Sequence, residues 1–154
     1  MIDERLHVAG HLIRRAHQAH DAIFAEETAG YDVTSAQLAG LSAIYWNPGI
    51  DLSSLAEFIG YDAATIGSLV SRLVNKRLVH RRIGKNDRRT RQLTLTPRGE
   101  TLLKLILRQA EHVETELLAV LNPEERRFFL SMLLRVVEAA ASRAESDSES
   151  TEIA

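Results

Sequence analysis

Two short helices with matching caps, separated by one glycine, restrict the fold of this chain more than any other feature. In GIDLSSLAEFIGYDAATIGSLVSRLVNKRLV, residues 49–79, Asp51 is placed to cap one helix and Asp62 to cap the next. Gly60 ends the first helix, because glycine readily adopts the left-handed conformation that closes a helix. Two capped helices with a tight turn between them predict a helix-turn-helix unit whose second helix runs to about Lys76.

Helices are expected on both sides of this unit, because apolar residues recur there at spacings of three, four and seven. Either Thr34 or Ser35 caps the second of these helices. Thr96 caps the third, whose first residue is Pro97. The predicted flanking helices span residues 3–27, 35–47, 97–121 and 122–141.

Two short strands follow the helix-turn-helix unit. LVHRRI, residues 78–83, and RQLTLT, residues 91–96, alternate apolar and polar side chains. The connection between them contains Gly84, Asn86 and Asp87, which favour a β-hairpin with a long tip. The predicted fold class is therefore mainly α, with a small β-hairpin wing.

Positive charge is concentrated around this hairpin, although the formal net charge of the chain is -2. Residues 72–98 contain 10 Lys and Arg and a single acid, Asp87, whereas residues 1–71 contain 3 basic and 9 acidic side chains. A local excess of this size is typical of a surface that binds phosphates. A solvated, charged hairpin without a ligand is the alternative.

The composition of the 154 residues excludes several classes of protein. The absence of cysteine excludes disulfides, Cys-ligated zinc and thiol oxidation. No apolar run approaches the ~18 residues that span a bilayer, and the N-terminus does not resemble a signal peptide, so a cytoplasmic protein with no membrane partner is expected. The sequence has no Gly-rich phosphate loop, no nucleophile elbow and no paired carboxylates in an evident cleft, so we expect neither an enzyme nor a cofactor.

Several motifs carry a family resemblance. DRR, residues 87–89, is followed by LTLTPRG, residues 93–99, and SAQLAGLSAI, residues 35–44, precedes the helix-turn-helix unit. In this order the motifs resemble the winged helix domain of the MarR family of transcriptional regulators. HLIRRAHQ, residues 11–18, is similar to the branch of the family that controls catabolism of aromatic acids and their CoA thioesters.

The resemblance implies one domain, residues 1–141, that forms an obligate homodimer. The winged helix-turn-helix DNA-binding lobe would span about 34–99, with N- and C-terminal dimerisation helices at about 1–29 and 97–141. Apolar runs such as FFLSMLLRVV agree with a homodimer, because they hold more apolar surface than one small domain covers. A larger monomeric core is the alternative. The acidic tail, residues 142–154, is expected to be disordered.

For DNA, the resemblance implies a pseudo-palindromic double-stranded operator, with repression by occlusion of a promoter. The helix predicted to enter the major groove presents small side chains. Gly67 and Ser68 stand where many relatives carry Thr and Arg, so the usual base contacts do not carry over directly. The expected DNA contacts on this helix are Ala64, Thr65, Ser68, Ser71 and Arg72. For Arg72 a solvent-facing salt bridge is the alternative.

The wing supplies the other expected DNA contacts. The family implies that Asp87 braces Arg89, which then reaches into the adjacent minor groove. Arg88 and Lys85 would contact phosphates. Arg91 lies on the second strand, where it either contacts DNA or solvates the hairpin.

A small-molecule effector is also implied, because family members usually bind one between the dimerisation helices and the DNA-binding lobe. For the branch named above it would be an aromatic carboxylate or its CoA thioester. Such a ligand needs a cation and an apolar wall. The candidate residues are His11, Arg14, Arg15, Tyr45 and Trp46. Alternatively, Arg14 and Arg15 are surface or subunit-interface charges.

Two other types of regulator remain open. His7 and His11 lie one helical turn apart, as do His17 and His20, and such pairs bind zinc when an acid joins them. A metal-responsive regulator is therefore an alternative, although the preferred interpretation assigns no metal ligands. An architectural DNA-binding protein without an effector is the other alternative, and it predicts no ligand pocket beside the first helix.

Overall fold

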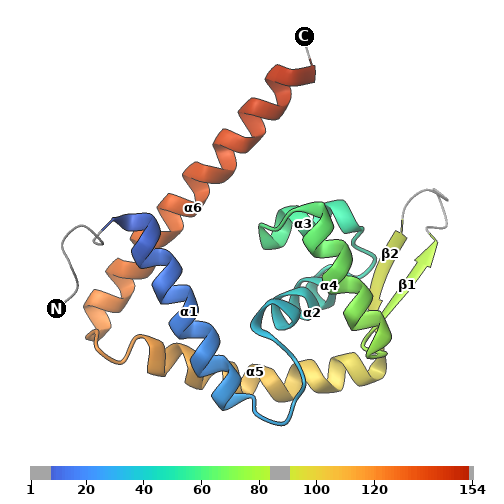
Figure 1. Cartoon of the computed structure of the whole chain (residues 1–154), viewed down its shortest axis with the longest axis horizontal. Coiled ribbons are helices and arrows are strands. Elements are labelled where there is room, and N and C mark those ends of the chain that lie inside the picture. The colour runs from blue at the N-terminus through green and yellow to red at the C-terminus, as the bar shows by residue number, and fades with distance from the viewer. Residues whose placement is uncertain (1–7, 84–90, 153–154) are drawn as a thin grey trace. The chain divides into compact units, whose positions relative to one another are not determined.

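The computed structural model describes residues 8–83 and 91–152, with side chains through residue 143. Within these residues it contains six helices and one antiparallel hairpin (Figure 1), which agrees with the predicted fold class. The elements in chain order are α1 (Ala9–Glu27), α2 (Ser35–Trp46), α3 (Leu52–Ile59), α4 (Ala63–Asn75), β1 (Val79–Ile83), β2 (Arg91–Leu95), α5 (Pro97–Leu117) and α6 (Pro123–Glu152). None of the described helices combines the length and apolar character needed to cross a membrane.

The caps of α3 and α4 form as the sequence predicts. The Asp51 carboxylate accepts a hydrogen bond from the Ser54 backbone N–H at 2.9 Å, and Asp62 accepts one from Thr65 at 2.8 Å. Between the two helices Gly60 has a φ of 76°, in the left-handed region. These local hydrogen bonds fix where each helix begins and therefore set the helix-turn-helix geometry.

The cap of α2 decides between the two predicted candidates. The Thr34 hydroxyl accepts a hydrogen bond from the Gln37 backbone N–H at 3.2 Å, and the Gln37 side chain accepts one from the Thr34 N–H at 3.4 Å. This reciprocal arrangement is a capping box. Thr34 is therefore the cap, and Ser35 is the first residue of the helix.

The wing is a hairpin in which Val79 pairs with Leu95 and Ile83 pairs with Arg91. A further segment, from the loop between α2 and α3, also bonds to β2. The Gly49 N–H donates to the Leu93 carbonyl at 2.8 Å, and the Leu93 N–H donates to the Ile50 carbonyl at 3.0 Å. The sequence does not predict this pairing, which fixes the base of the wing to the helical part of the lobe.

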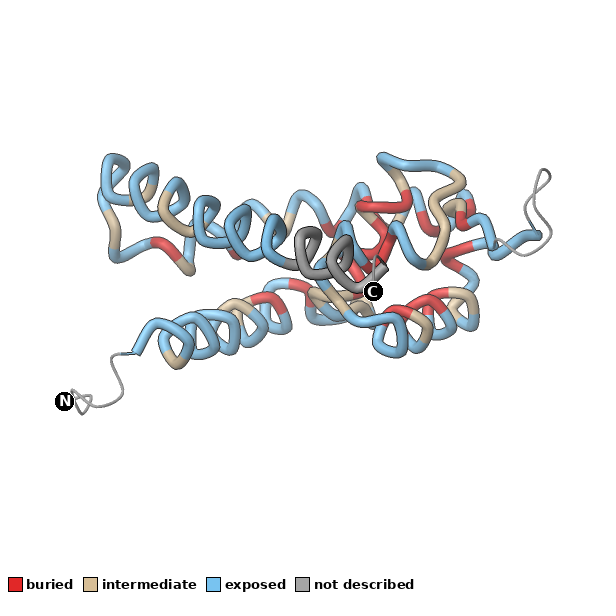
Figure 2. The backbone as a smooth tube through the Cα atoms, turned by 90° about the horizontal axis from the view of Figure 1, so that it is seen from above, coloured by how far each residue is buried: buried red, intermediate tan, exposed pale blue. Residues whose placement is uncertain are grey.

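The buried core lies mainly in α2 to α4 and the hairpin, where red segments concentrate in Figure 2. Helix α1 adds Phe24, and α5 adds Leu103, Ile106 and Val113. The large side chains at most 1% exposed are Leu41, Ile44, Leu55, Ile66, Leu73, Leu78, Leu93, Leu103, Ile106, Val70 and Val113. Residues 1–116, which hold this core, form one compact unit.

The segment that leads from β2 into α5 explains the LTLTPRG motif. The Thr96 hydroxyl accepts a hydrogen bond from the Gly99 N–H at 2.9 Å and donates one to the Arg77 carbonyl at 2.8 Å. A Cβ on Gly99 would lie 2.1 Å from the Leu78 carbonyl oxygen. Only glycine therefore fits where the first turn of α5 packs against Leu78, between α4 and β1.

Residues 117–154 form a second compact unit. Asn122 caps α6, because its side-chain oxygen accepts hydrogen bonds from the N–H groups of Glu124 and Glu125 at 2.9 and 3.0 Å. The backbone remains helical to Glu152. Alanine, glutamate and arginine are frequent in residues 138–145, and their helix propensity favours continuation of α6.

Candidate nucleic-acid interface

Helix α4 has a buried face and an exposed face. The buried face consists of Ile66, Leu69, Val70 and Leu73. All five residues predicted to contact DNA from this helix are exposed, namely Ala64, Thr65, Ser68, Ser71 and Arg72. The core therefore holds the helix by one side and presents the predicted contacts on the other.

Internal hydrogen bonds occupy part of the exposed face. The Thr65 hydroxyl donates to the Asp62 carboxylate at 2.7 Å, so its methyl group is the part that remains available. The Ser71 hydroxyl donates to the Gly67 carbonyl at 2.8 Å and can still accept a hydrogen bond. Within the part of the chain that the structure describes, the side chains of Ser68 and Arg72 have no partner, so the alternative salt bridge of Arg72 does not form there.

Asp62 serves as the N-cap and also holds Thr65 in place. The backbone N–H of Thr65, and next its hydroxyl, donate to the carboxylate and lower the pKa of Asp62 below its ordinary value. The carboxylate is therefore charged at neutral pH, and the first turn of α4 is ordered before any ligand arrives.

Gly67 leaves an open position in the middle of the exposed face. A Cβ added there would meet nothing within 4 Å. The flat surface at Gly67 lets another molecule approach the helix backbone more closely than a larger side chain would allow. Packing inside the described chain therefore does not require a glycine at this position.

A shallow cleft of about 390 Å³ runs between the start of α2 and the exposed face of α4. Its lining consists of Thr34, Ala36, Gln37, Ala64, Thr65, Ser68, Leu69 and Arg72. The Arg72 guanidinium and the N-terminal end of the α2 dipole both favour negative charge in this cleft. The cleft thus joins four of the five predicted α4 contacts to a site suited to a phosphate.

The wing presents arginines on both faces of the hairpin. Arg81 and Arg91 occupy positions of the same parity in the strand register, and Arg82 lies on the opposite face. All three are exposed. The predicted contacts Lys85, Asp87, Arg88 and Arg89 lie outside the described residues.

The predicted effector residues make side-chain contacts within α1 or within α2. On α1, the Arg14 Nη2 lies 3.2 Å from the His11 Nδ1, and Arg15 donates to the Gln18 side chain at 3.4 Å. On α2, the rings of Tyr45 and Trp46 meet edge to face at a centroid distance of 5.1 Å. Among residues 8–83, no described contact joins the predicted effector residues of α1 to those of α2.

A cavity of about 410 Å³ contains charges that the sequence-based prediction missed. It lies where the α1–α2 loop, the end of α4 and the start of α5 meet, and it is lined by Gly30, Tyr31, Asp32, Asn75, Lys76, Arg77, Leu78, Arg98 and Leu102. The Lys76 ammonium lies 3.1 Å from the Asp32 carboxylate and 3.2 Å from the Gln37 side-chain oxygen. No spacing rule predicts this cavity, because its residues come from three separate segments.

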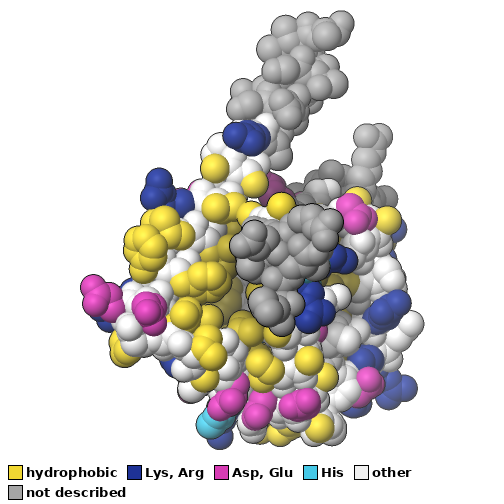
Figure 3. Space-filling model, turned by 60° about the vertical axis from the view of Figure 1, so that its left-hand side comes forward, with side chains coloured by type: hydrophobic (Ala, Val, Ile, Leu, Met, Phe, Trp, Pro, Cys, Tyr) yellow, Lys and Arg dark blue, Asp and Glu magenta, His cyan; other side chains and the backbone are white. Residues whose placement is uncertain are grey.

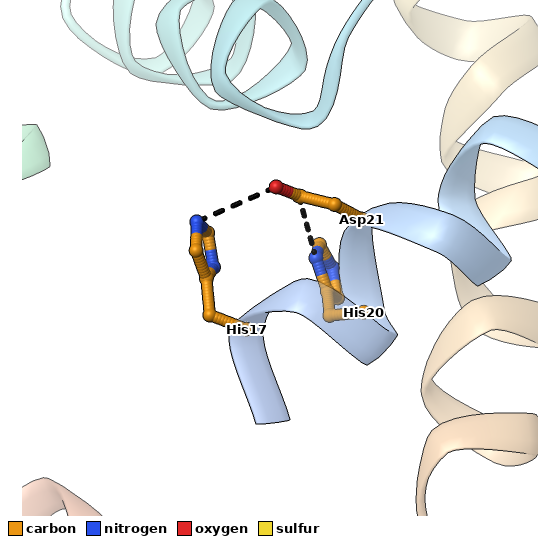
Figure 4. A group of neighbouring side chains, drawn as sticks. All are labelled: His17, His20 and Asp21. Atoms are coloured by element: carbon orange, nitrogen blue, oxygen red, sulfur yellow. Dashed lines mark hydrogen bonds and ion pairs between the residues drawn. The ribbon is translucent and has the colours of Figure 1, made fainter. Parts of the chain in front are cut away.

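One histidine pair on α1 gains an acidic neighbour, as Figure 4 shows. His17 Nε2 lies 3.5 Å from one Asp21 carboxylate oxygen, and His20 Nδ1 lies 3.4 Å from the other. Burial raises the pKa of Asp21, but a hydrogen bond from Ser35, a hydrogen bond with His20 and the nearby His17 together lower it below its ordinary value. His11 instead contacts Arg14, and His7 lies outside the described residues.

Comparison with known proteins identifies related regulators. The family model described as "MarR family" matches residues 33–90, which hold the helix-turn-helix unit and most of the wing. The transcriptional regulator HosA of Escherichia coli is 31% identical over 131 residues, which cover 85% of this chain and 96% of HosA.

Solved structures show the same fold. One solved structure is of BpsR from Bordetella bronchiseptica and concerns the regulation of its DNA binding by 6-hydroxynicotinic acid. It superposes on this chain with a TM-score of 0.82 and 29% identity, covering 89% of this chain and 98% of BpsR. The transcriptional repressor CouR bound to a 23-mer DNA duplex superposes with a TM-score of 0.81 and 25% identity, covering 89% and 97%.

Proposed function

The chain belongs to the MarR family of transcriptional regulators, and from that premise we propose that it is a homodimeric repressor of a pseudo-palindromic operator. The observation that carries this proposal is the exposed face of α4. A buried core fixes the opposite face, and Ser68 and Arg72 have side chains without partners in the described chain. An aromatic carboxylate, or its CoA thioester, would release the repressor from DNA.

Helix α4 would enter the major groove, where base edges present distinct donors and acceptors. The Thr65 methyl, left available by the bond between its hydroxyl and Asp62, suits contact with a thymine methyl. Ser68 would hydrogen-bond a base edge or phosphate, and the open surface at Gly67 permits close approach. Arg72 would hold a phosphate in the cleft beside the start of α2.

The wing would reach the neighbouring minor groove. We retain the expectation that Asp87 aims Arg89 into this groove, while Lys85 and Arg88 contact phosphates. Narrow minor grooves have an enhanced negative potential, which attracts an inserted guanidinium. Arg81 and Arg91, which share one face of the hairpin, would add positive charge beside the DNA backbone.

Selection of bound duplexes from random DNA, followed by titrations at several salt concentrations, tests the DNA interface. Arg72→Ala should weaken binding and reduce the slope of log K against log salt by about one. Arg108→Ala, which removes an exposed arginine of α5, is the matched control and should change neither quantity. If both variants weakened DNA binding equally, binding would depend only on the overall positive charge of the protein and not on Arg72 in particular. Unchanged binding by Arg72→Ala would remove Arg72 from the interface.

The exposed apolar side chains of α6 support the homodimer. The large hydrophobic side chains that are exposed on its described part are Phe128, Phe129, Leu130, Leu134, Val136 and Val137. Hydrophobic side chains also reach the surface of the face shown in Figure 3. Surfaces of this kind on a folded chain mark an interaction site. Sedimentation of the full chain should therefore give a dimer, and a monomer at micromolar concentration would contradict the proposal.

The effector class draws support from BpsR, whose DNA binding is described as regulated by 6-hydroxynicotinic acid. That compound is an aromatic carboxylate. We propose two candidate sets of residues for such a ligand. One is the predicted set on α1 and α2, with Arg15 as the cation and Tyr45 or Trp46 as the wall. The other is the cavity of about 410 Å³, where Arg77 and Arg98 accompany Tyr31 and Leu102.

Thermal-shift titration with a panel of aromatic carboxylates and their CoA thioesters tests both locations. A compound that raises the unfolding temperature should also release DNA. Arg15→Ala should abolish the response if the α1 site is correct, and Arg98→Ala should abolish it if the cavity is correct. Absence of a response to every compound would favour the architectural alternative.

A further inference from the structure

We propose that His17, His20 and Asp21 form a binding site for a divalent transition-metal ion on α1. The donor atoms of the three side chains all lie within 4.8 Å of one another. The site is separate from the exposed face of α4 and from the cavity at Arg98. It therefore adds a second kind of ligand to the regulator and does not depend on the identity of its effector.

The distances between the histidine nitrogens and the carboxylate oxygens are close to those between ligands of a metal site. Ligands about 2.0 to 2.1 Å from a tetrahedral zinc ion are separated from one another by about 3.3 Å. Each imidazole of the cluster lies 3.4 or 3.5 Å from an Asp21 carboxylate oxygen. His17 and Asp21 are four residues apart and His17 and His20 are three apart, so the helix itself places them on one face. Small rotations of the exposed His17 and Asp21 side chains would complete the geometry.

A hydrogen bond from another helix positions the carboxylate. The Ser35 hydroxyl, at the start of α2, donates to Asp21 Oδ1 at 2.6 Å. Adjacent helical residues normally point in different directions, and this bond helps to explain why Asp21 lies beside both histidines. Outer hydrogen bonds of this kind orient metal ligands and raise affinity. Ser35 is therefore a positioning residue of the site and joins it to the lobe.

The rings of the two histidines are also held in place. They stack on one another at an interplanar angle of 8° with centroids 6.3 Å apart. The ring of His20 stacks in turn on Phe24, with centroids 6.2 Å apart, and Phe24 belongs to the buried core. Core packing thus limits the motion of His20, which lowers the ordering cost of binding an ion.

The donor set favours transition metals over magnesium and calcium. Two imidazole nitrogens and one carboxylate oxygen match the preferences of Zn²⁺, Ni²⁺ and Co²⁺, whereas Mg²⁺ and Ca²⁺ prefer oxygen. Three protein ligands leave at least one position for water, and His17 and Asp21 are exposed enough to admit it. A cluster that served only as an ion pair would bind no metal, and the titration below distinguishes the two.

Isothermal titration of the full chain with Zn²⁺ alone, in the absence of DNA, tests the proposal directly. We expect one Zn²⁺ per chain. His17→Ala and His20→Ala should each weaken binding by at least about tenfold, as should Ser35→Ala through loss of the outer hydrogen bond. The visible absorption of bound Co²⁺ provides a second readout, because its intensity reports four-coordinate geometry and should fall in the same variants.

Matched variants separate this site from other histidines. His112→Ala removes an exposed histidine from α5 and should leave Zn²⁺ binding unchanged. His11→Ala tests the other predicted histidine pair and should also have no effect. Asp21→Asn keeps the size of the side chain, and far-ultraviolet circular dichroism in EDTA should show it folded while its Zn²⁺ binding is weakened.

Three outcomes would overturn the proposal. They are the absence of saturable Zn²⁺ binding, binding that survives the His17→Ala/His20→Ala double substitution, and binding that is lost equally in His112→Ala. Because DNA is absent from the titration, failure of the metal site leaves the proposed operator binding untouched. Failure of operator binding likewise leaves the metal site untouched.

Discussion

The lobe from α2 to β2 and the described part of α6 use apolar residues in opposite ways. In the lobe, Leu41 and Leu55 are fully buried, so the chain completes this core by itself. In α6, Phe128 is 65% exposed and Leu134 is 57% exposed. The contrast indicates that the lobe is stabilised by its own packing, whereas α6 exposes apolar side chains that the described chain does not bury.

The largest expected effect concerns a glycine that the lobe requires. Gly99→Ala should lower the free energy of unfolding by about 3 kcal/mol, because its Cβ would lie 2.1 Å from the Leu78 carbonyl oxygen. That oxygen belongs to the backbone, so relieving the clash requires a backbone shift. Chemical denaturation measures the change.

The matched substitution Gly67→Ala should raise the free energy of unfolding by about 0.5 to 1 kcal/mol. Its Cβ would meet nothing within 4 Å, and alanine favours the middle of a helix more than glycine does. Operator affinity should fall, since the added methyl group hinders close approach. A variant that is more stable and binds DNA equally well would show that the flat surface at Gly67 has no role.

The second prediction compares the two regions directly. Leu73→Ala in the lobe should cost about 3 kcal/mol, since Leu73 is fully buried. Leu134→Ala in α6 should cost less than about 0.5 kcal/mol in a dissociated chain, because the side chain is exposed. Denaturation is to be measured at two protein concentrations.

If a second subunit covers α6, the cost of Leu134→Ala should rise with protein concentration, because dimerisation contributes to stability by mass action. The cost of Leu73→Ala should then stay the same at both concentrations. A Leu134→Ala cost that is small at every concentration would leave the comparison intact but contradict a dimer formed through this residue.

An ion pair that joins the α1–α2 loop to the end of α4 gives the next effect. Lys76→Met should cost about 1 kcal/mol, because it removes the ammonium that binds both Asp32 and Gln37, and Gln37 is buried. Thermal unfolding measures the loss. Lys104→Met on α5, whose ammonium lies 4.0 Å from Glu100 at the surface, is the control and should cost less than about 0.5 kcal/mol. Equal costs would mean that Lys76 acts as a surface residue.

The smallest effect is a pH dependence at the start of α4. Because hydrogen bonds lower the pKa of Asp62 in the folded chain, its contribution to stability is present above the unfolded pKa and is lost as pH falls below about 4. Asp62→Asn retains a capping side chain that does not titrate. Its unfolding temperature should therefore fall less than that of the wild type between neutral and acidic pH. Parallel losses in both proteins would remove Asp62 as a source of acid sensitivity.

Much of the fold was predictable because helix ends are encoded locally. Asp51, Asp62 and Asn122 each form hydrogen bonds with backbone groups only two or three residues ahead, and these residues are recognisable in the sequence. The exposed face of α4 follows from the same logic, since apolar residues at helical spacing define its buried side. The helix-turn-helix unit and its outward residues were therefore available from sequence alone.

The candidate ligand sites were less predictable. The histidine spacing on α1 identifies His17 and His20, but the choice of this pair over His7 and His11 depends on Asp21 and on its bond to Ser35, 14 residues away. The cavity at Arg98 combines segments that no periodicity connects. The predicted effector residues on α1 and α2 share no described contact, because nothing in their spacing specifies how the two helices cross.

The sequence by itself determined the order of the helices, the residues that cap them, the charged hairpin and the membership of the MarR family. Tertiary structure alone decided the pairing of Gly49 and Ile50 with Leu93, and the close approach of Gly99 to Leu78. The physical reason is the distance along the sequence between the residues in contact. A cap depends on atoms within one helical turn, whereas each of these contacts joins segments about 20 or more residues apart that meet only when the core has formed.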